Sequence, residues 1–329
     1  MGFALRESFI GLLLMVSGCA AKDTTPCNST VPPSEPPATA TSHAIISIDP
    51  APSRVVYALS DIHGGYDRLA TLLAKNGVLA GLPPSPDTAE WAAGDAVLVV
   101  AGDLIDKGPQ PVEVIDALRA LEASASRSGG LVLVLLGNHE AEFLADPSNN
   151  KASASGGLNK ELAAKGLDCG LVASGVDPRG AWLRARPLGA RVGAWFYSHA
   201  GNTKGRSLAA LDDALRGALS TPARFAHPEI IGSDSILEAR DWYADPAVAR
   251  ANAASLGVAH FVFGHDPNAL GPRGAIAFGQ EGLVVRIDCG MSPDVNDSSG
   301  CLLRVRRDGM TEVAEQLTAD GRTTPLFRQ

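Results

Sequence analysis

The chain has 329 residues, of which 45% are hydrophobic and 19% charged, so its composition is that of a globular protein with a full-sized core. Its 28 Lys and Arg against 36 Asp and Glu give a net charge of −8, which argues against sequence-independent nucleic-acid binding, because that requires a basic surface. The composition also excludes a coiled coil, a collagen and a polytopic membrane protein.

The first residues have the pattern of an export signal. An apolar run over residues 9–16 is too short to span a bilayer, but it suits the hydrophobic region of a signal peptide. It ends in Val-Ser-Gly-Cys19, which resembles the lipobox of bacterial lipoproteins. We therefore expect residues 1–19 to be a lipoprotein signal peptide with Cys19 lipidated. Since no aspartate follows the cysteine, the resemblance implies a lipid anchor in the outer membrane, with the protein facing the periplasm. An ordinary signal peptide with an incidental cysteine is the alternative.

Residues 20–53 are rich in Pro, Thr and Ser and show no hydrophobic period, which predicts an extended, disordered tether. Four more cysteines follow Cys19 along the chain, at Cys27, Cys169, Cys289 and Cys301. In an oxidising compartment they could form two disulfides, and the last two could bridge across a hairpin. Unpaired small core residues are the alternative.

From residue 54 onwards, short apolar runs alternate with helical patterns. Strands are expected at residues 55–59, 96–101, 131–136, 195–198, 261–263, 283–288 and 302–305, and helices at 66–75 and 112–121. Residues 54–308 therefore predict one α/β domain with an insertion at about 142–190. The tail at 309–329 shows little pattern.

Each of the first five strands ends in polar residues that can bind a metal. These ends are Asp61-Ile-His63-Gly64, Gly102-Asp103-Leu-Ile-Asp106-Lys107-Gly108, Gly137-Asn138-His139-Glu140, His199-Ala-Gly201 and Gly264-His265. Because ligands of open α/β sheets bind at the carboxyl ends of the strands, we expect the five ends to form one site.

This series of motifs resembles the calcineurin-like metallophosphoesterases and, within them, the phosphoprotein phosphatase superfamily. The segments 180–187 and 286–292 are similar to the bacterial Shewanella-like branch. The resemblance runs from about Val55 to Leu303. It implies a four-layer α/β sandwich of two mixed sheets flanked by helices, and a helical insertion. It also implies a two-metal phosphomonoesterase that acts on a phosphoprotein, at Ser/Thr or Tyr, or on a small phosphoester.

The resemblance also implies roles for individual residues. The first metal would be held by Asp61, His63 and Asp103, and the second by Asp103, Asn138, His199 and His265. Imidazole, carboxylate and amide donors without a thiolate suit Mn, Fe or Zn. His139 is the expected general acid, oriented by Asp106, while Glu140 is expected to brace the turn.

Two cations are expected to bind the substrate phosphate, Lys107 and Arg240, although Arg184 and Arg186 compete with Arg240 for this role. Lys107 stands where the superfamily usually has Arg, and an ammonium cannot grip two oxygens as a guanidinium does. Protein phosphatase specificity is therefore open. A phosphodiesterase or dinucleoside polyphosphate hydrolase on the same scaffold is the enzymatic alternative, and a non-catalytic binding protein is a third.

Overall fold

A computed structural model describes residue 1, residues 24–29 and residues 43–329. The predicted lipidation site, Cys19, lies outside these residues, as does half of the predicted tether. Within the described ranges, no helix is both long and apolar enough to cross a bilayer.

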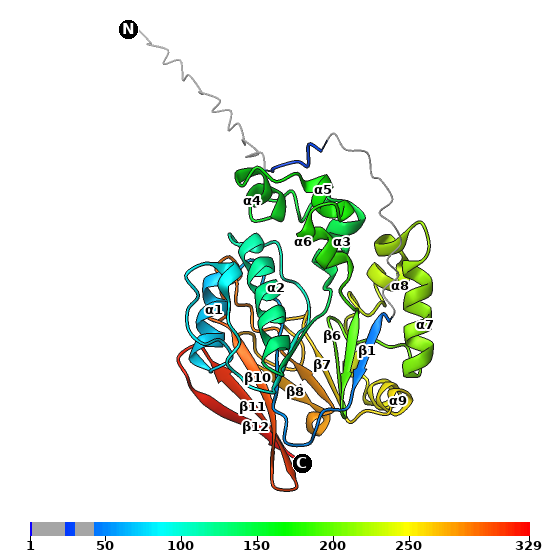
Figure 1. The fold of residues 1–329 in the computed structure, drawn as a ribbon. Coiled ribbons are helices and arrows are strands. Elements are labelled where there is room, and N and C mark those ends of the chain that lie inside the picture. Colours follow the sequence, from blue (N-terminus) through cyan, green and yellow to red (C-terminus); the bar gives the residue numbers. More distant parts are fainter. Residues whose placement is uncertain (2–23, 30–42) are drawn as a thin grey trace.

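Two mixed sheets of six strands form the centre of the protein (Figure 1). The first has the order β1 (Ile45–Ile48), β5 (Gly189–Val192), β6 (Trp195–Ser198), β7 (His260–Phe263), β9 (Val284–Arg286) and β8 (Ala277–Gly279). The second has the order β12 (Thr323–Arg328), β11 (Thr311–Thr318), β10 (Cys301–Asp308), β2 (Val56–Leu59), β3 (Val97–Val100) and β4 (Leu131–Val134). Parallel pairing joins β2, β3 and β4 in one sheet and β6, β7 and β9 in the other.

The inner faces of the two sheets share one apolar layer. Alternate residues of β2 and β3, such as Val56, Ala58 and Val97, pack there with Tyr197 and Val262 of the first sheet. Because neighbouring side chains of a strand point to opposite faces, the intervening residues pack outward against helices. The predicted sandwich of two mixed sheets flanked by helices is thus confirmed.

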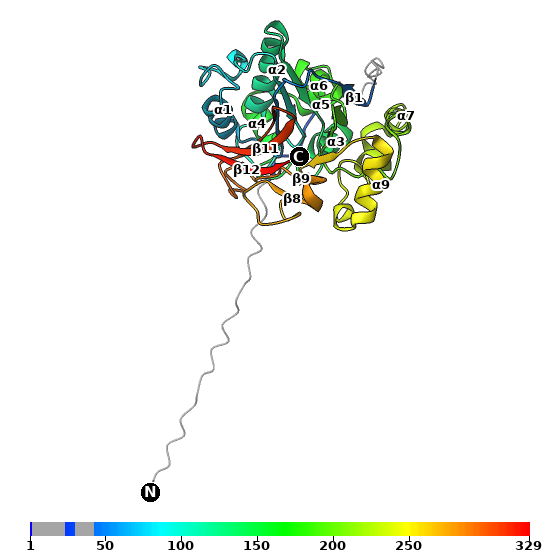
Figure 2. The ribbon, with the colours of Figure 1, turned by 90° about the horizontal axis from the view of Figure 1, so that it is seen from below.

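The helices lie on both outer sides of this sandwich and around one end. They are α1 (Tyr66–Lys75), α2 (Pro111–Arg127), α3 (Asn138–Ala145), α4 (Leu158–Ala164), α5 (Cys169–Ser174), α6 (Pro178–Arg184), α7 (Leu208–Leu219), α8 (Pro228–Ile231) and α9 (Pro246–Leu256). Figure 2 shows α1 and α2 on one side of the sheets and α7 and α9 on the other. Helices α4, α5 and α6 belong to the predicted insertion and gather at the end of the molecule opposite the C-terminus (Figure 1).

The structure differs from the sequence-based expectation at both ends of the catalytic domain. Residues 45–48, inside the predicted tether, form β1, which pairs in parallel with β5. The predicted tail forms β11 and β12, which extend the second sheet beyond β10. The alternation of β11 is hard to recognise because Glu315 occupies a buried position, where Arg304 and Arg306 neutralise its carboxylate.

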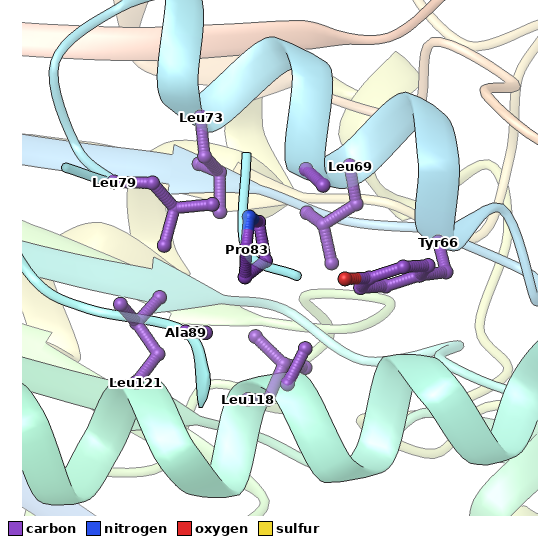
Figure 3. A pocket seen from close by; sticks show the side chains of 10 residues that line it. Tyr66, Leu69, Leu73, Leu79, Pro83, Ala89, Leu118 and Leu121 are labelled. Carbon is purple, nitrogen blue, oxygen red and sulfur yellow. The ribbon is translucent and has the colours of Figure 1, made fainter. Parts of the chain in front are cut away.

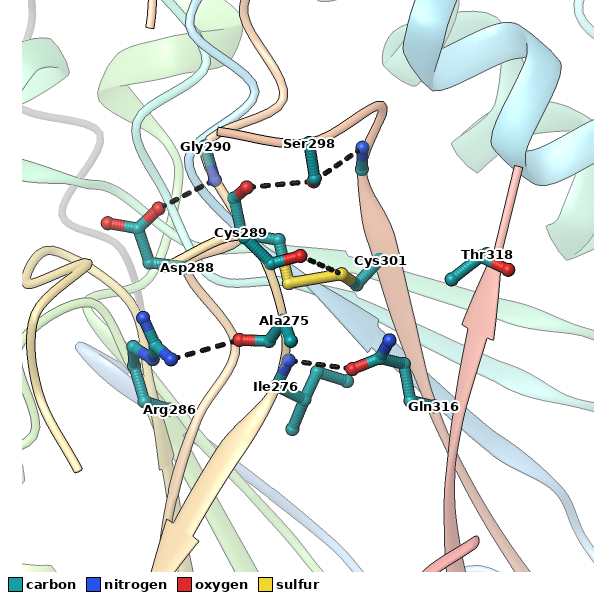
Figure 4. Close-up of a disulfide and its surroundings, with 12 residues drawn as sticks. Ala275, Ile276, Arg286, Asp288, Cys289, Gly290, Ser298, Cys301, Gln316 and Thr318 are labelled. Carbon is teal, nitrogen blue, oxygen red and sulfur yellow. Dashed lines mark hydrogen bonds between the residues drawn. A yellow bond between two sulfur atoms is a disulfide. The ribbon is translucent and has the colours of Figure 1, made fainter. Parts of the chain in front are cut away.

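The four described cysteines form two disulfides. Cys27 is bonded to Cys169 at the start of α5, which attaches residues 24–29 to the insertion. The backbone N–H of Thr25 also donates to the carbonyl of Ser153. Figure 4 shows the second disulfide, Cys289–Cys301, which closes the loop before β10. The sequence left open whether these four cysteines are paired, and in the structure all four are.

Helices α1 and α2 face each other through leucines and alanines, with Pro83 between them and Tyr66 to one side (Figure 3). The gap between them has a volume of about 10 Å³, close to that of one water molecule, and leucine and alanine side chains line most of it. This gap is therefore a packing defect of the core rather than a ligand site.

Candidate functional site

The predicted ligand residues meet at the carboxyl ends of the strands. Asp61 follows β2, Asp103 follows β3, His199 follows β6 and His265 follows β7, while Asn138 begins α3 just after β4. Two groups of side chains have their donor atoms within 4.8 Å of one another. One is His63, Asp103 and His139, and the other is Asp61, Asp103 and His199.

Asp103 lies at the centre of both groups, and its two oxygens face different sides. Oδ2 is 3.4 Å from Nε2 of His63 and 3.8 Å from Nε2 of His139. Oδ1 is 3.2 Å from Nε2 of His199, whose ring lies edge-on to that of His265. One carboxylate therefore connects two clusters of donors, which is the arrangement that a pair of metal ions requires.

Two of the imidazoles are oriented by backbone carbonyls. Nδ1 of His63 is 3.0 Å from the carbonyl oxygen of Ile105, and Nδ1 of His199 is 2.9 Å from that of Ala101. A carbonyl can only accept, so Nδ1 carries a hydrogen in both rings and Nε2 is the nitrogen left for a metal ion. Both Nε2 atoms therefore point into the cluster as metal donors, as in metalloproteins whose histidines have such carbonyl partners. With carboxylate and amide oxygens nearby, the donor set fits divalent metal ions.

The backbone around the site is unusual. Left-handed φ values occur at six of the predicted site residues, namely Asp61, His63, Asp103, Asp106, Lys107 and His265. Such conformations are costly for residues other than glycine and collect at functional sites. Two neighbouring glycines allow the strand ends to approach. A Cβ at Gly137 would collide with Oδ1 of Asp103, and one at Gly264 would collide with Oδ2 of Asp61.

Glu140 braces this backbone, as the sequence predicted. Its fully buried carboxylate accepts hydrogen bonds from the N–H groups of Asp103, Leu104, Ile105 and Gly137, over 2.7 to 3.1 Å. Burial and the charge of Asp103 raise the pKa of Glu140 to about 7. Glu140 thus fixes the loop that carries Asp103 and does not face the pocket.

The ionisable groups of the cluster shift one another's pKa values. Burial opposes the ionisation of Asp103, but the charges of His199 and His139 hold its pKa well below the usual value. Burial likewise opposes a charge on His199, yet Asp103 raises the pKa of His199 to about 9. Burial, with the charge of His199, lowers the pKa of His265 to about 3. The anionic centre therefore attracts cations, and a metal ion would compete with the proton on His199.

His139 and Asp106 form a buried pair beside the cluster. Nδ1 of His139 lies 2.8 Å from Oδ2 of Asp106, whose Oδ1 accepts from the N–H of Leu158. The carboxylate fixes the ring so that Nε2 faces Asp103 and the open pocket. This geometry suits a proton donor that is held in one orientation.

A pocket of about 620 Å³ opens over the cluster. Its lining includes the predicted residues Asp103, Asp106, Lys107, Asn138, His139, Arg240 and His265. Lys107 places Nζ 3.0 Å from Nε2 of His63. Arg240 donates to the carbonyl of His265 and pairs with Asp266 at 3.2 Å.

The two competing arginines do not line this pocket. Arg186 pairs with Glu122 at 2.8 Å and lies over the ring of Trp182. Arg184 donates to the carbonyl of Ala173. Both therefore stabilise the insertion, and Arg240 is the arginine that reaches the site.

Sequence reasoning missed several residues of the site. Asp294 and Val295 come from the loop closed by the second disulfide, and the insertion supplies Asn150, Lys151, Ala154, Ser155 and Gly156. The polar composition of the first half of the insertion was the available signal. No motif indicated Asp294.

Residues 54–274 match a family model described as calcineurin-like phosphoesterase. The chain belongs to this family. Among its curated relatives, Shewanella-like protein phosphatase 2 of Arabidopsis thaliana is 34% identical over 89 residues, which cover 27% of this chain and 21% of the relative. A symmetrical bis(5'-nucleosyl)-tetraphosphatase of Methylococcus capsulatus is 30% identical over 146 residues, covering 44% and 42%. The chain thus matches less than half the length of each of these two relatives.

Solved structures agree with the calcineurin-like fold. The crystal structure of a cold-active protein-tyrosine phosphatase from a psychrophilic Shewanella species has a TM-score of 0.67 at 22% identity, covering 86% of this chain and 82% of that one. A protein serine/threonine phosphatase of Saccharomyces cerevisiae has a TM-score of 0.58 at 16% identity, covering 83% of each chain. At these identities the likeness shows the shared fold.

Proposed function

We propose that the protein is a two-metal phosphomonoesterase, and that its substrate is a phosphoprotein or a small phosphate monoester. The observation that carries this proposal is the position of Asp103, whose two oxygens face separate donor clusters. Family membership and the cationic side chains of the overlying pocket support it.

The residues divide into three tasks. Asp61 and His63 would hold one metal with Asp103, while Asn138, His199 and His265 would hold the other, with Mn, Fe or Zn as the fitting ions. Two metal ions activate a water molecule and neutralise phosphoryl oxygens. Lys107 and Arg240 bind and orient the phosphate of the substrate. His139 donates a proton from Nε2 to the leaving oxygen, and Asp106 holds the hydrogen on Nδ1.

The direct test measures phosphate release from para-nitrophenyl phosphate together with metal content. The wild-type chain should bind two ions and lose activity with a chelator, and activity should return with added Mn²⁺. Asp103→Asn should lose both activity and metal, because one carboxylate serves both ions. Full occupancy and normal turnover in Asp103→Asn would contradict the two-metal assignment.

A dinucleoside polyphosphate hydrolase is the second candidate, favoured by the tetraphosphatase relative. Phospho-Ser, phospho-Thr and phospho-Tyr peptides should be compared with a dinucleoside tetraphosphate under identical metal loading. A kcat/KM at least tenfold higher for a phosphopeptide supports the proposed class, and the reverse ranking supports the alternative.

We also infer that the mature protein is lipid-anchored through Cys19 in the outer membrane and faces the periplasm. The two disulfides support an oxidising compartment. A Cys19→Ala variant expressed in bacterial cells should keep its precursor mass and fail to incorporate labelled lipid. Unchanged labelling would contradict the anchor.

A further inference from the structure

The amide of Asn138 has partners on both sides. Its Oδ1 lies 3.1 Å from Nε2 of His199 and so faces the donor cluster around Asp103. Its Nδ2 donates to Oε1 of Glu142 at 3.1 Å and to Oε1 of Glu238 at 3.3 Å. A side-chain amide has two N–H donors and one carbonyl acceptor. Both donors are therefore used by carboxylates, and only the oxygen is directed at the metal cluster.

The partners of Asn138 come from separate segments of the chain. Glu142 lies one turn further along α3, so the helix itself brings it next to Asn138. Glu238 belongs to the loop between α8 and α9, two residues before Arg240. Lys151 of the insertion lies 2.5 Å from Oε1 of Glu142 and also lines the pocket. Three charged side chains thus surround one uncharged candidate ligand.

This arrangement has a cost that calls for an explanation. Glu142 and Glu238 place two carboxylates near a pocket that must accept an anionic phosphate. Asn138 itself is buried, so its Nδ2 needs hydrogen-bond acceptors, but a backbone carbonyl would serve without adding charge. Carboxylates bind N–H donors more strongly than neutral acceptors do. A carboxylate therefore differs from a backbone carbonyl at this position in that it holds the amide more strongly.

We propose that Glu142 and Glu238 are positioning residues that fix the amide of Asn138 with its oxygen toward the second metal, with Lys151 offsetting their charge. The terminal torsion of an asparagine is soft and roughly two-fold, so an unrestrained amide can turn its NH₂ group toward the cation. The hydrogen bonds from Nδ2 to the carboxylates also shift electron density within the amide toward Oδ1, which makes Oδ1 a stronger metal ligand. This inference rests on the proposed function, since it requires Asn138 to be a metal ligand.

The test measures Mn²⁺ binding to the purified chain by calorimetric titration, in addition to activity. Glu142→Ala and Glu238→Ala should each weaken one of the two Mn²⁺ sites by about 10-fold, and the double variant by up to about 100-fold, the range for residues that support metal ligands. Glu142→Gln keeps a neutral acceptor oxygen for Nδ2 and should therefore recover part of the affinity but not all of it. Glu122→Ala is the matched control, because it removes a carboxylate that contacts Arg186 and Trp182.

The same substitution in an Asn138→Asp variant distinguishes a positioning role of Glu142 from a general effect on stability. In the Asn138→Asp variant there is no amide to orient, and the nearby carboxylates repel the new charge. Adding Glu142→Ala to that variant should therefore leave Mn²⁺ affinity unchanged or raise it. If Glu142→Ala weakened Mn²⁺ binding equally in the wild-type chain and in the Asn138→Asp variant, its role would be structural and the inference would be overturned. A wild-type chain that fails to bind two Mn²⁺ ions would instead contradict the proposed function itself.

Discussion

The buried pair of His139 and Asp106 is predicted to act as one unit in protonating the leaving group. Their side chains are only 4% and 2% exposed, and the contact between Nδ1 and Oδ2 is 2.8 Å. The second oxygen of Asp106 is held by the N–H of Leu158, so the carboxylate cannot turn away. His139 is thus fixed with Nε2 available to the substrate.

The expected magnitudes follow from this geometry. His139→Asn removes the proton donor and should lower kcat on an alkyl phosphate by about 10²–10⁴-fold. Asp106→Ala removes one hydrogen bond to a charged group, worth about 1.5–3 kcal/mol, which corresponds to a loss of roughly 10- to 150-fold. Because Asp106 acts through His139, the double variant should lose no more than His139→Asn alone.

The assay compares an alkyl phosphate with an activated aryl phosphate, and determines metal content for each variant. An activated aryl leaving group departs without a proton, so both variants should lose much less activity on it. Equal losses on the two esters would refute the general-acid role. Loss of one metal from His139→Asn would make His139 a ligand, which its 3.8 Å distance from Asp103 would permit.

Three further predictions concern the pocket and its surroundings. Lys107→Ala should lower kcat/KM by roughly 10- to 150-fold, because a charged contact to phosphate is lost. Lys107→Arg should keep most of the activity. If kcat/KM changed by no more than about twofold in both variants, Lys107 would have no role in phosphate binding. Replacing Cys289 and Cys301 by Ser should lower the free energy of unfolding by about 2–3 kcal/mol in urea titrations, since the disulfide closes a short loop with a sequence separation of 12. Burial and a hydrogen bond with Glu113 raise the pKa of Glu161 to about 8. Between about pH 4.5 and pH 8 the folded state therefore keeps a proton on Glu161 that the unfolded state loses. The contribution of this proton to the free energy of unfolding is lost as the pH rises through that range. Glu161→Gln should abolish that part of the decline, measured as thermal unfolding at about pH 5 and pH 8, and an unchanged pH dependence would contradict the shift.

Much of the fold and site could be predicted because the information is local. The helix predicted at residues 66–75 is α1 with the same bounds, and the buried runs before Asp61, Asp103 and His199 are β2, β3 and β6. Each of these strands places its ligand at or within three residues of its end. The five motifs therefore predicted one site without any knowledge of how the strands pair.

Features that depend on distant partners could not be predicted in this way. Glu238 reaches Asn138 from a segment far along the chain, and Lys151 approaches the same cluster from an insertion rich in small residues. Strand β1 follows a Pro-rich region and acquires its partner only when β5 is placed beside it. Glu315 is an unfavourable residue for a buried strand position until two arginines from β10 neutralise it.

The pairing of β2 with β10 has a consequence for the order in which the chain can mature. Leu303 is opposite Ala58, so a strand made early is completed by one made near the end of synthesis. Contacts of such long range are slow to form, because the chain between them must first be brought together. Strand β2 leads directly into Asp61, and its sheet remains open on that side until β10 arrives. The nascent protein therefore completes this sheet only after nearly the whole chain has emerged.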